Sequence, residues 1–135
     1  MGTRSRVGIM QGDVCKSVYC HYDGYLDHTG RVLQARWDEA EVLKLIKMGD
    51  NSGIQESVDE MNFYKDRGET GVGAIKAHSF KEFLDQVQSC FAEYYYVMRD
   101  GVWYAGCVYE TQGLKKGGLV PLSQALEVLA VAEDQ

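Results

Sequence analysis

The sequence predicts an α+β fold with a mainly antiparallel sheet, built from an N-terminal and a C-terminal hairpin and packed against about three helices. Two alternating apolar and polar stretches, residues 4–11 and 14–21, flank a Gly-Asp pair that favours a two-residue turn. Asp100-Gly101 stands in the same way between two runs of aromatic and β-branched residues. Strands that pair locally, interspersed with helices, are typical of this fold class.

Helix boundaries are marked by capping residues. Asp38 followed by Glu41 has the spacing of a capping box, and Gly49 stands where the helix would end. Ser79 opens a second pattern of this kind, and Pro121 is suited to the first position of a helix that runs to about residue 131. The apolar residues predicted to face the core are Val42, Leu43, Leu45, Ile46 and Met48, then Phe80, Phe83, Leu84 and Val87, then Leu122, Leu126 and Leu129.

The rest of the chain between these elements carries fewer signals. Residues 50–78 are interpreted mostly as loop, with 61–64 as a short strand. No repeat, linker or low-complexity tract divides the sequence, so residues 1–135 are expected to form one domain.

Charge and composition restrict the class of partner. The 135 residues are 45% hydrophobic and 25% charged, as is ordinary for a folded protein, and the net charge is -6. Nucleic acids and membrane surfaces are polyanions that favour clustered Lys and Arg, so general binding to either is not expected. The start of the chain resembles neither a signal peptide nor a membrane span, and the four cysteines form no Cys-x-x-Cys pair. A cytoplasmic location with reduced thiols is therefore expected.

The stretch 18–30, Val-Tyr-Cys-His-Tyr-Asp-Gly-Tyr-Leu-Asp-His-Thr-Gly, gathers the densest set of chemically versatile side chains. A strand is expected to run out into a loop here. Exposed aromatic groups give a large contact area at low entropic cost, so the loop is typical of a recognition surface. Packing of the tyrosines and a simple turn at Asp23 are the alternative reading. The candidate binding residues are Tyr19, His21, Tyr22, Asp23, Tyr25 and His28.

A charged turn at residues 65–69, Lys-Asp-Arg-Gly-Glu, is the second candidate segment. Arg67 is suited to pair with Asp23 or another carboxylate, or to hold a phosphate. A solvated turn without a ligand is the other reading. The candidate binding residues here are Asp66, Arg67 and Glu69.

Metal binding and nucleophilic catalysis are less favoured. Cys20, His21, Asp23 and His28 have no recognised zinc spacing, and Cys20 and His21 would point to opposite sides of a strand. A cysteine on a strand, such as Cys15 or Cys20, is most often a small buried apolar residue. We therefore assign no catalytic residue, no metal and no cofactor, and favour a protein that is not an enzyme.

Several segments together resemble one protein family. The stretch Ser-Val-Tyr-Cys-His-Tyr-Asp-Gly-Tyr with His28 and Gly30 after it, Leu-Ile-Lys-Met-Gly-Asp, Lys-Asp-Arg-Gly-Glu and a late aromatic hairpin occur in this order. They resemble the Tyr-Cys-His-x-Asp-Gly-Tyr segment, helix end, Asp-Arg-Gly-Glu turn and hairpin of small uncharacterised proteins from bacteriophages and mobile elements. The resemblance covers most of the chain, although residues 50–62 are shorter than in many members.

The resemblance implies an accessory protein of phage type, made in the host bacterial cytoplasm. Such a protein is expected to bind a host factor, for example a restriction, CRISPR or nucleotide-signalling defence, and to inhibit or modulate it. Its partner would be a host protein or a small anionic ligand. One alternative is a small hydrolytic or nucleotide-modifying enzyme, with His21 or His28 as base and Asp23 orienting it. Another is a sponge that holds a signalling nucleotide with Arg67 and stacked tyrosines, without cleaving it.

Overall fold

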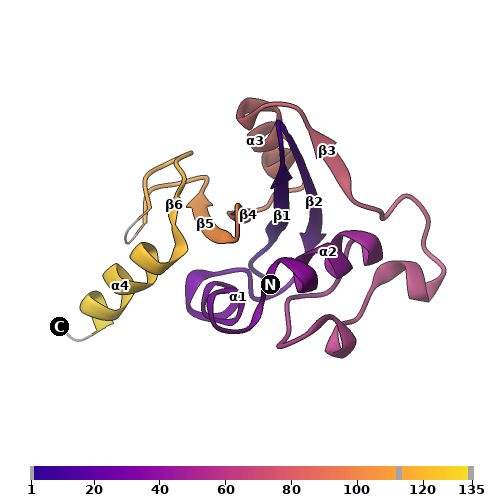
Figure 1. Ribbon diagram of the computed structural model, residues 1–135, viewed down its shortest axis with the longest axis horizontal. Coiled ribbons are helices and arrows are strands. Elements are labelled where there is room, and N and C mark those ends of the chain that lie inside the picture. The colour runs from indigo at the N-terminus through magenta and orange to yellow at the C-terminus, as the bar shows by residue number, and fades with distance from the viewer. Residues whose placement is uncertain (1, 112–113, 134–135) are drawn as a thin grey trace.

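The computed structural model describes residues 2–111 and 114–133, which form a six-stranded sheet with helices on both faces (Figure 1). The strand order is β3-β2-β1-β4-β5-β6, and all neighbouring pairs are antiparallel except the parallel pair of β1 and β4. The predicted α+β class and mainly antiparallel sheet are confirmed. The strands are β1 (Ser5–Gln11), β2 (Val14–Cys20), β3 (Ile75–Ala77), β4 (Tyr94–Arg99), β5 (Val102–Cys107) and β6 (Val120–Pro121); the α-helices are α1 (Arg31–Arg36), α2 (Glu39–Met48), α3 (Phe80–Ser89) and α4 (Leu122–Glu133).

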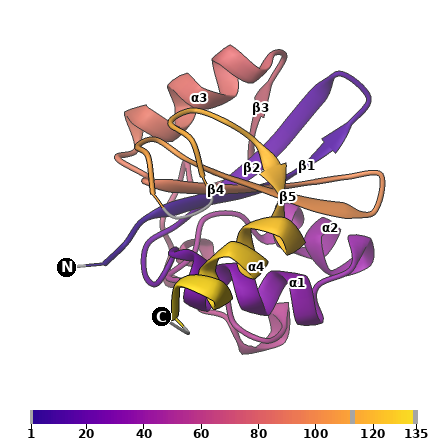
Figure 2. The same cartoon turned by 90° about the vertical axis from the view of Figure 1, so that its left-hand side faces the viewer.

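The helices lie on opposite sides of the sheet. Figure 2 presents the sheet nearly edge-on, with α3 above it and α1, α2 and α4 below it. The larger core lies on the side of these three helices and includes Val7, Tyr96 and Trp103. The smaller core lies under α3 and includes Cys15 and Tyr95. Because both faces are covered, buried positions run without interruption through most of β1 and β4.

Both hairpins have the predicted turns. Gly12 takes a φ of 63° between β1 and β2, and Asp100 and Gly101 take φ of 51° and 78° between β4 and β5. The two successive positive φ values at Asp100 and Gly101 suit the right-handed twist of β4 and β5. In β2 the side chains alternate as expected, because Cys15 packs in the core under α3 and Cys20 in the core on the other side.

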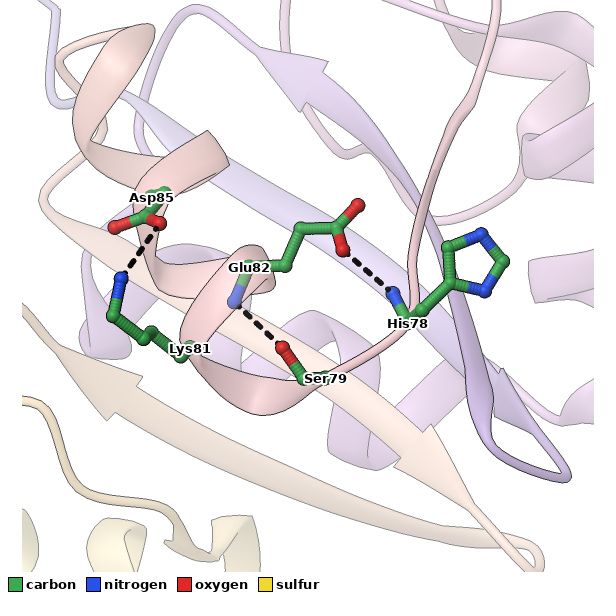
Figure 3. A network of polar contacts seen from close by, with 5 residues as sticks. All are labelled: His78, Ser79, Lys81, Glu82 and Asp85. Atoms are coloured by element: carbon green, nitrogen blue, oxygen red, sulfur yellow. Dashed lines mark hydrogen bonds and ion pairs between the residues drawn. The ribbon is translucent and has the colours of Figure 1, made fainter.

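Two of the helices begin at the predicted capping residues. Asp38 accepts a hydrogen bond from the Glu41 amide at 2.9 Å, but the Glu41 carboxylate accepts from the Val58 amide at 2.8 Å instead of from the cap. In a full capping box the Glu41 carboxylate would accept a hydrogen bond from the Asp38 amide. Here it instead binds the backbone of the loop that contains Val58. At α3 (Figure 3), Ser79 accepts from the Glu82 amide at 3.0 Å, and Glu82 accepts from the His78 amide at 3.3 Å.

Three details differ from the sequence prediction. Residues 61–64 are not a strand, because Phe63 makes only an isolated bridge to Asn51 and Tyr64 begins the short helical turn η3 (Tyr64–Arg67). Pro121 lies in β6, paired with Tyr104, so α4 begins one residue later. The described chain has four α-helices where about three were expected. One of the four is the short α1, which follows a π-helical turn, η1 (Leu26–Gly30).

Candidate functional site

The segment after α2 joins the two parts of the chain that carry the candidate residues. The Asn51 amide donates to the Tyr19 carbonyl at 2.9 Å, and the Tyr22 amide donates to the Ser52 carbonyl at 2.7 Å. On the other side of the same segment, the Tyr64 amide donates to the Asp50 carbonyl at 3.1 Å. Residues 50–52 therefore lie between the end of β2 and η3, which brings the loop after β2 and the charged turn to the same side.

The end of β2 carries a compact group of polar rings. The Tyr19 hydroxyl and His21 Nδ1 lie 2.6 Å apart, and the ring of Tyr22 packs edge-on against His21 with centroids 4.4 Å apart. Burial raises the pKa of Tyr19, and the Arg4 guanidinium beside its hydroxyl offsets part of that shift. Tyr22 remains 49% exposed, so this group presents an aromatic surface to solvent.

The turn η3 contributes a second aromatic ring and a cation. The Arg67 guanidinium carbon lies 4.2 Å from the centre of the Tyr64 ring, within the range of a cation–π contact. Arg67 also pairs with Glu69 at 2.6 Å, and its side chain is 59% exposed. An exposed pair of this kind is weak, so Arg67 can exchange Glu69 for a ligand at low cost.

These residues form one surface, which we call the Tyr-Arg surface. Residues 50–52 join its two parts, because the Tyr22 amide donates to the Ser52 carbonyl at 2.7 Å and the Tyr64 amide donates to the Asp50 carbonyl at 3.1 Å. Burial raises the pKa of Tyr64, and the Ser52 side chain and the Arg67 guanidinium offset part of that shift. A hollow of about 260 Å³ borders the surface at Ser52, Asn62 and Arg67. The Tyr-Arg surface consists of Arg4, Tyr19, His21, Tyr22, Tyr64 and Arg67.

Of the other sequence-predicted residues, Asp23, Tyr25 and His28 make separate contacts, whereas Asp66 and Glu69 border the surface at Arg67. Asp23 turns the chain with a φ of 59°, and its carbonyl accepts from the Thr29 hydroxyl at 2.6 Å. His28 Nε2 lies 3.3 Å from the Ile54 carbonyl, and Tyr25 packs on His28 with ring centroids 6.3 Å apart. Asp66 and Glu69 belong to the charged turn beside Arg67. No described contact joins Asp23 to Arg67, so the suggested pair between them is not formed.

The enzyme hypothesis requires a carboxylate that orients a histidine. The described hydrogen bonds of His21 and His28 lead to Tyr19 and to a backbone carbonyl, and neither leads to Asp23. Among residues 2–111 and 114–133, no group of three His, Cys, Asp or Glu side chains is placed to hold a metal ion. The His–Asp pair on which the enzyme hypothesis depends is therefore not formed among the described hydrogen bonds.

The cysteines on β2 are expected to resist alkylation in the folded protein. Burial raises the pKa of Cys15 to about 11 and that of Cys20 to about 12, from an ordinary 9.0, so few thiolates form near neutral pH. Keeping both thiols neutral contributes stability that is fully present below pH 9.0 and is lost as the pH rises toward 12. Iodoacetamide labelling with peptide mapping at pH 8 should find Cys90 modified well before Cys15 or Cys20, because Cys90 is only partly buried. Equal labelling of Cys20 in the folded protein would contradict its burial.

Sequence reasoning missed two members of the Tyr-Arg surface. Arg4 precedes β1 and reaches Tyr19 on the neighbouring strand because Arg6 and Tyr19 are register partners. Tyr64 directly precedes the charged turn, which is the signal that could have identified it. Its position before Lys65 places it one helical turn from Arg67.

Comparisons with known proteins add no relative. The chain matches no protein family, no curated protein and no solved structure among those compared. Within the described residues, no helix is long and apolar enough to cross a membrane.

Proposed function

We propose that the protein is a non-enzymatic accessory protein of phage type that binds a host factor through the Tyr-Arg surface and inhibits or modulates it. The observation that carries this proposal is the Arg67 guanidinium stacked on Tyr64, on a segment that residues 50–52 join to the exposed Tyr22. Tyrosine and arginine are the residue types that dominate the energetics of protein interfaces. A defence component of the bacterial cytoplasm is the class of target that we favour.

The shape of the site agrees with a protein partner. The hollow beside Arg67 is small, at about 260 Å³, below the usual size of a pocket that encloses a drug-sized ligand. The aromatic rings of the Tyr-Arg surface come from two segments that backbone hydrogen bonds of residues 50–52 hold together. A rigid group of this kind loses little conformational entropy on binding, which favours affinity.

The double variant Tyr22→Ala with Arg67→Ala should lose host-factor binding and keep the fold. Each residue is exposed and contributes little to the core, so the melting temperature should change little. Capture from a host lysate, followed by quantitative mass spectrometry, would measure binding. The control is Val102→Ala with Arg99→Ala, which removes an exposed apolar side chain and an exposed arginine from the hairpin of β4 and β5. Capture that is equal for both variants would reject the Tyr-Arg surface as the binding site.

A nucleotide sponge is the second candidate. Arg67 on the Tyr64 ring and Arg4 beside Tyr19 offer two cations and two stacking rings, the groups that hold a phosphate and a base. Native mass spectrometry of the protein purified from its host would reveal a retained nucleotide. A nucleotide recovered unchanged after denaturation would favour the sponge, and a bound host protein would favour the leading proposal.

A further inference from the structure

A groove lies between α2 and the hairpin of β1 and β2. It has a volume of about 440 Å³, and its walls come from Gln11 at the end of β1, Lys16 of β2 and the outer face of α2. Lys16 is the register partner of Ile9, whose side chain belongs to the core on the α2 side, so both point toward this helix. The groove therefore lies where the face of β1 and β2 extends past α2, the helix that covers it.

The floor of the groove is apolar. Ala40, Leu43 and Ile46 line it from α2, and Leu43 is 38% exposed although the helix turns its other apolar face into the core. These positions are spaced three residues apart and so share one side of the helix. An apolar side chain of a partner would find a hydrophobic surface here that the chain itself leaves uncovered.

The rim of the groove is positive. Lys16, Lys44 and Lys47 line it, and no acidic residue does, although acidic residues outnumber basic ones in the chain by 20 to 14. The one described ion pair among them joins Lys44 to Glu41 at 3.7 Å, with the lysine 62% exposed, which is a weak contact. Lysine stems can cover the apolar floor while their ammonium groups stay in water. This local concentration of positive charge contrasts with a net charge of -6.

The charge and composition of the groove lining favour one class of ligand over the others. An extended nucleic acid would require more cations and aromatic rings for stacking, and the groove lining has no aromatic residue and no arginine. A membrane surface recruits polybasic clusters larger than three lysines. A short peptide segment with one apolar side chain between carboxylates would fill the floor and pair with the rim, which is the pattern of electrostatic complementarity at interfaces.

We propose that this groove is a docking site for an acidic peptide segment of a partner protein, anchored by one apolar side chain between Ala40, Leu43 and Ile46. The site is separate from the Tyr-Arg surface and does not depend on the function proposed for that surface. It adds a second contact through which a partner of acidic sequence is recognised.

The test uses fluorescent peptides in which one leucine is flanked by glutamates at varied spacing. Anisotropy titration should give binding that weakens with salt, and the matched peptides with glutamine for glutamate or serine for leucine should bind about tenfold more weakly. The variant Lys44→Glu with Lys47→Glu should lose a similar factor. Leu43→Ser should also weaken binding while it leaves the rim charges in place.

Two control variants distinguish binding in the groove from binding elsewhere on the protein. Lys81→Glu with Lys115→Glu places the same charge change on α3, which covers the other face of the sheet, and on the segment before β6, and should bind the peptides as the unaltered protein does. Tyr22→Ala with Arg67→Ala should also bind them normally, so failure of one proposal is distinguishable from failure of the other. Absence of peptide binding, or equal loss in the Lys81→Glu and Lys115→Glu control, overturns the proposal. Self-association that the Lys44→Glu and Lys47→Glu changes abolish would overturn it in favour of a second copy.

Discussion

Replacing Trp103 by alanine is expected to lower the free energy of unfolding by about 4 kcal/mol. Trp103 is 4% exposed on β5, and its indole N–H donates to the Trp37 carbonyl at 2.9 Å. The side chain thus fills the larger core and also ties the sheet to the corner between α1 and α2. Alanine would leave a cavity and an unpaired carbonyl, and both add to the cost. Urea denaturation followed by circular dichroism would measure the loss.

Trp103→Phe is the matched control for this change. Phenylalanine retains most of the buried ring and removes only the donor to Trp37, so a smaller loss of about 1 to 2 kcal/mol is expected. A loss below about 1 kcal/mol for the alanine variant would mean that the packing around β5 and α1 is not as described.

Replacing Arg6 by alanine should lower the free energy of unfolding by about 3 kcal/mol. Arg6 is 4% exposed and donates to the Ser17 hydroxyl at 2.9 Å and to the Ser17 carbonyl at 3.0 Å. Its third described contact is to the Cys90 sulfur at 3.8 Å, and no ion pair to Arg6 is present among the described residues. A buried guanidinium without a carboxylate retains a desolvation cost that hydrogen bonds only partly offset.

The Arg6→Met variant tests that cost directly. Methionine fills most of the volume without the charge, so we expect it to destabilise the protein clearly less than alanine does. Chemical denaturation of both variants under one set of conditions gives the comparison. Equal losses would show that the hydrogen bonds to Ser17, and not the buried volume, account for the stabilising effect of Arg6.

The predicted parts of the fold are those with local signals. The Asp100-Gly101 turn and the caps at Asp38 and Ser79 depend on neighbours within a few residues, so their sequence patterns suffice. The parallel pairing of β1 with β4 joins residues nearly ninety positions apart, as in the pair of Ser5 and Tyr94, and no local pattern encodes it. For the same reason the contact from Glu41 to Val58 was not foreseen.

The candidate site was predictable as two segments but not as one surface. Tyr19, His21 and Tyr22 were identified by the density of polar rings, and Arg67 by its charged turn. Their proximity depends on backbone hydrogen bonds made by residues 50–52, whose sequence Asp-Asn-Ser gives no sign of them.

The backbone turn at Asp23 separates the predicted loop into two groups of side chains. Its positive φ turns the chain, and the following residues wind into η1. The ring of Tyr25 then packs on His28, which reaches the Ile54 carbonyl, whereas the described contacts of His21 are to Tyr19 and Tyr22. Backbone conformation at one residue thus divides a dense sequence segment into two separate groups.

Photocrosslinking at position 22 would test the Tyr-Arg surface most directly. A benzophenone amino acid in place of Tyr22, irradiated in host cells, should give one dominant adduct with a host protein, because this ring is 49% exposed and packs against His21 of the same surface. The same group in place of Val102, which is 47% exposed on the hairpin of β4 and β5, provides the control. An adduct at position 22 that Arg67→Ala abolishes is the predicted result; no adduct there, or the same adduct from position 102, would contradict it.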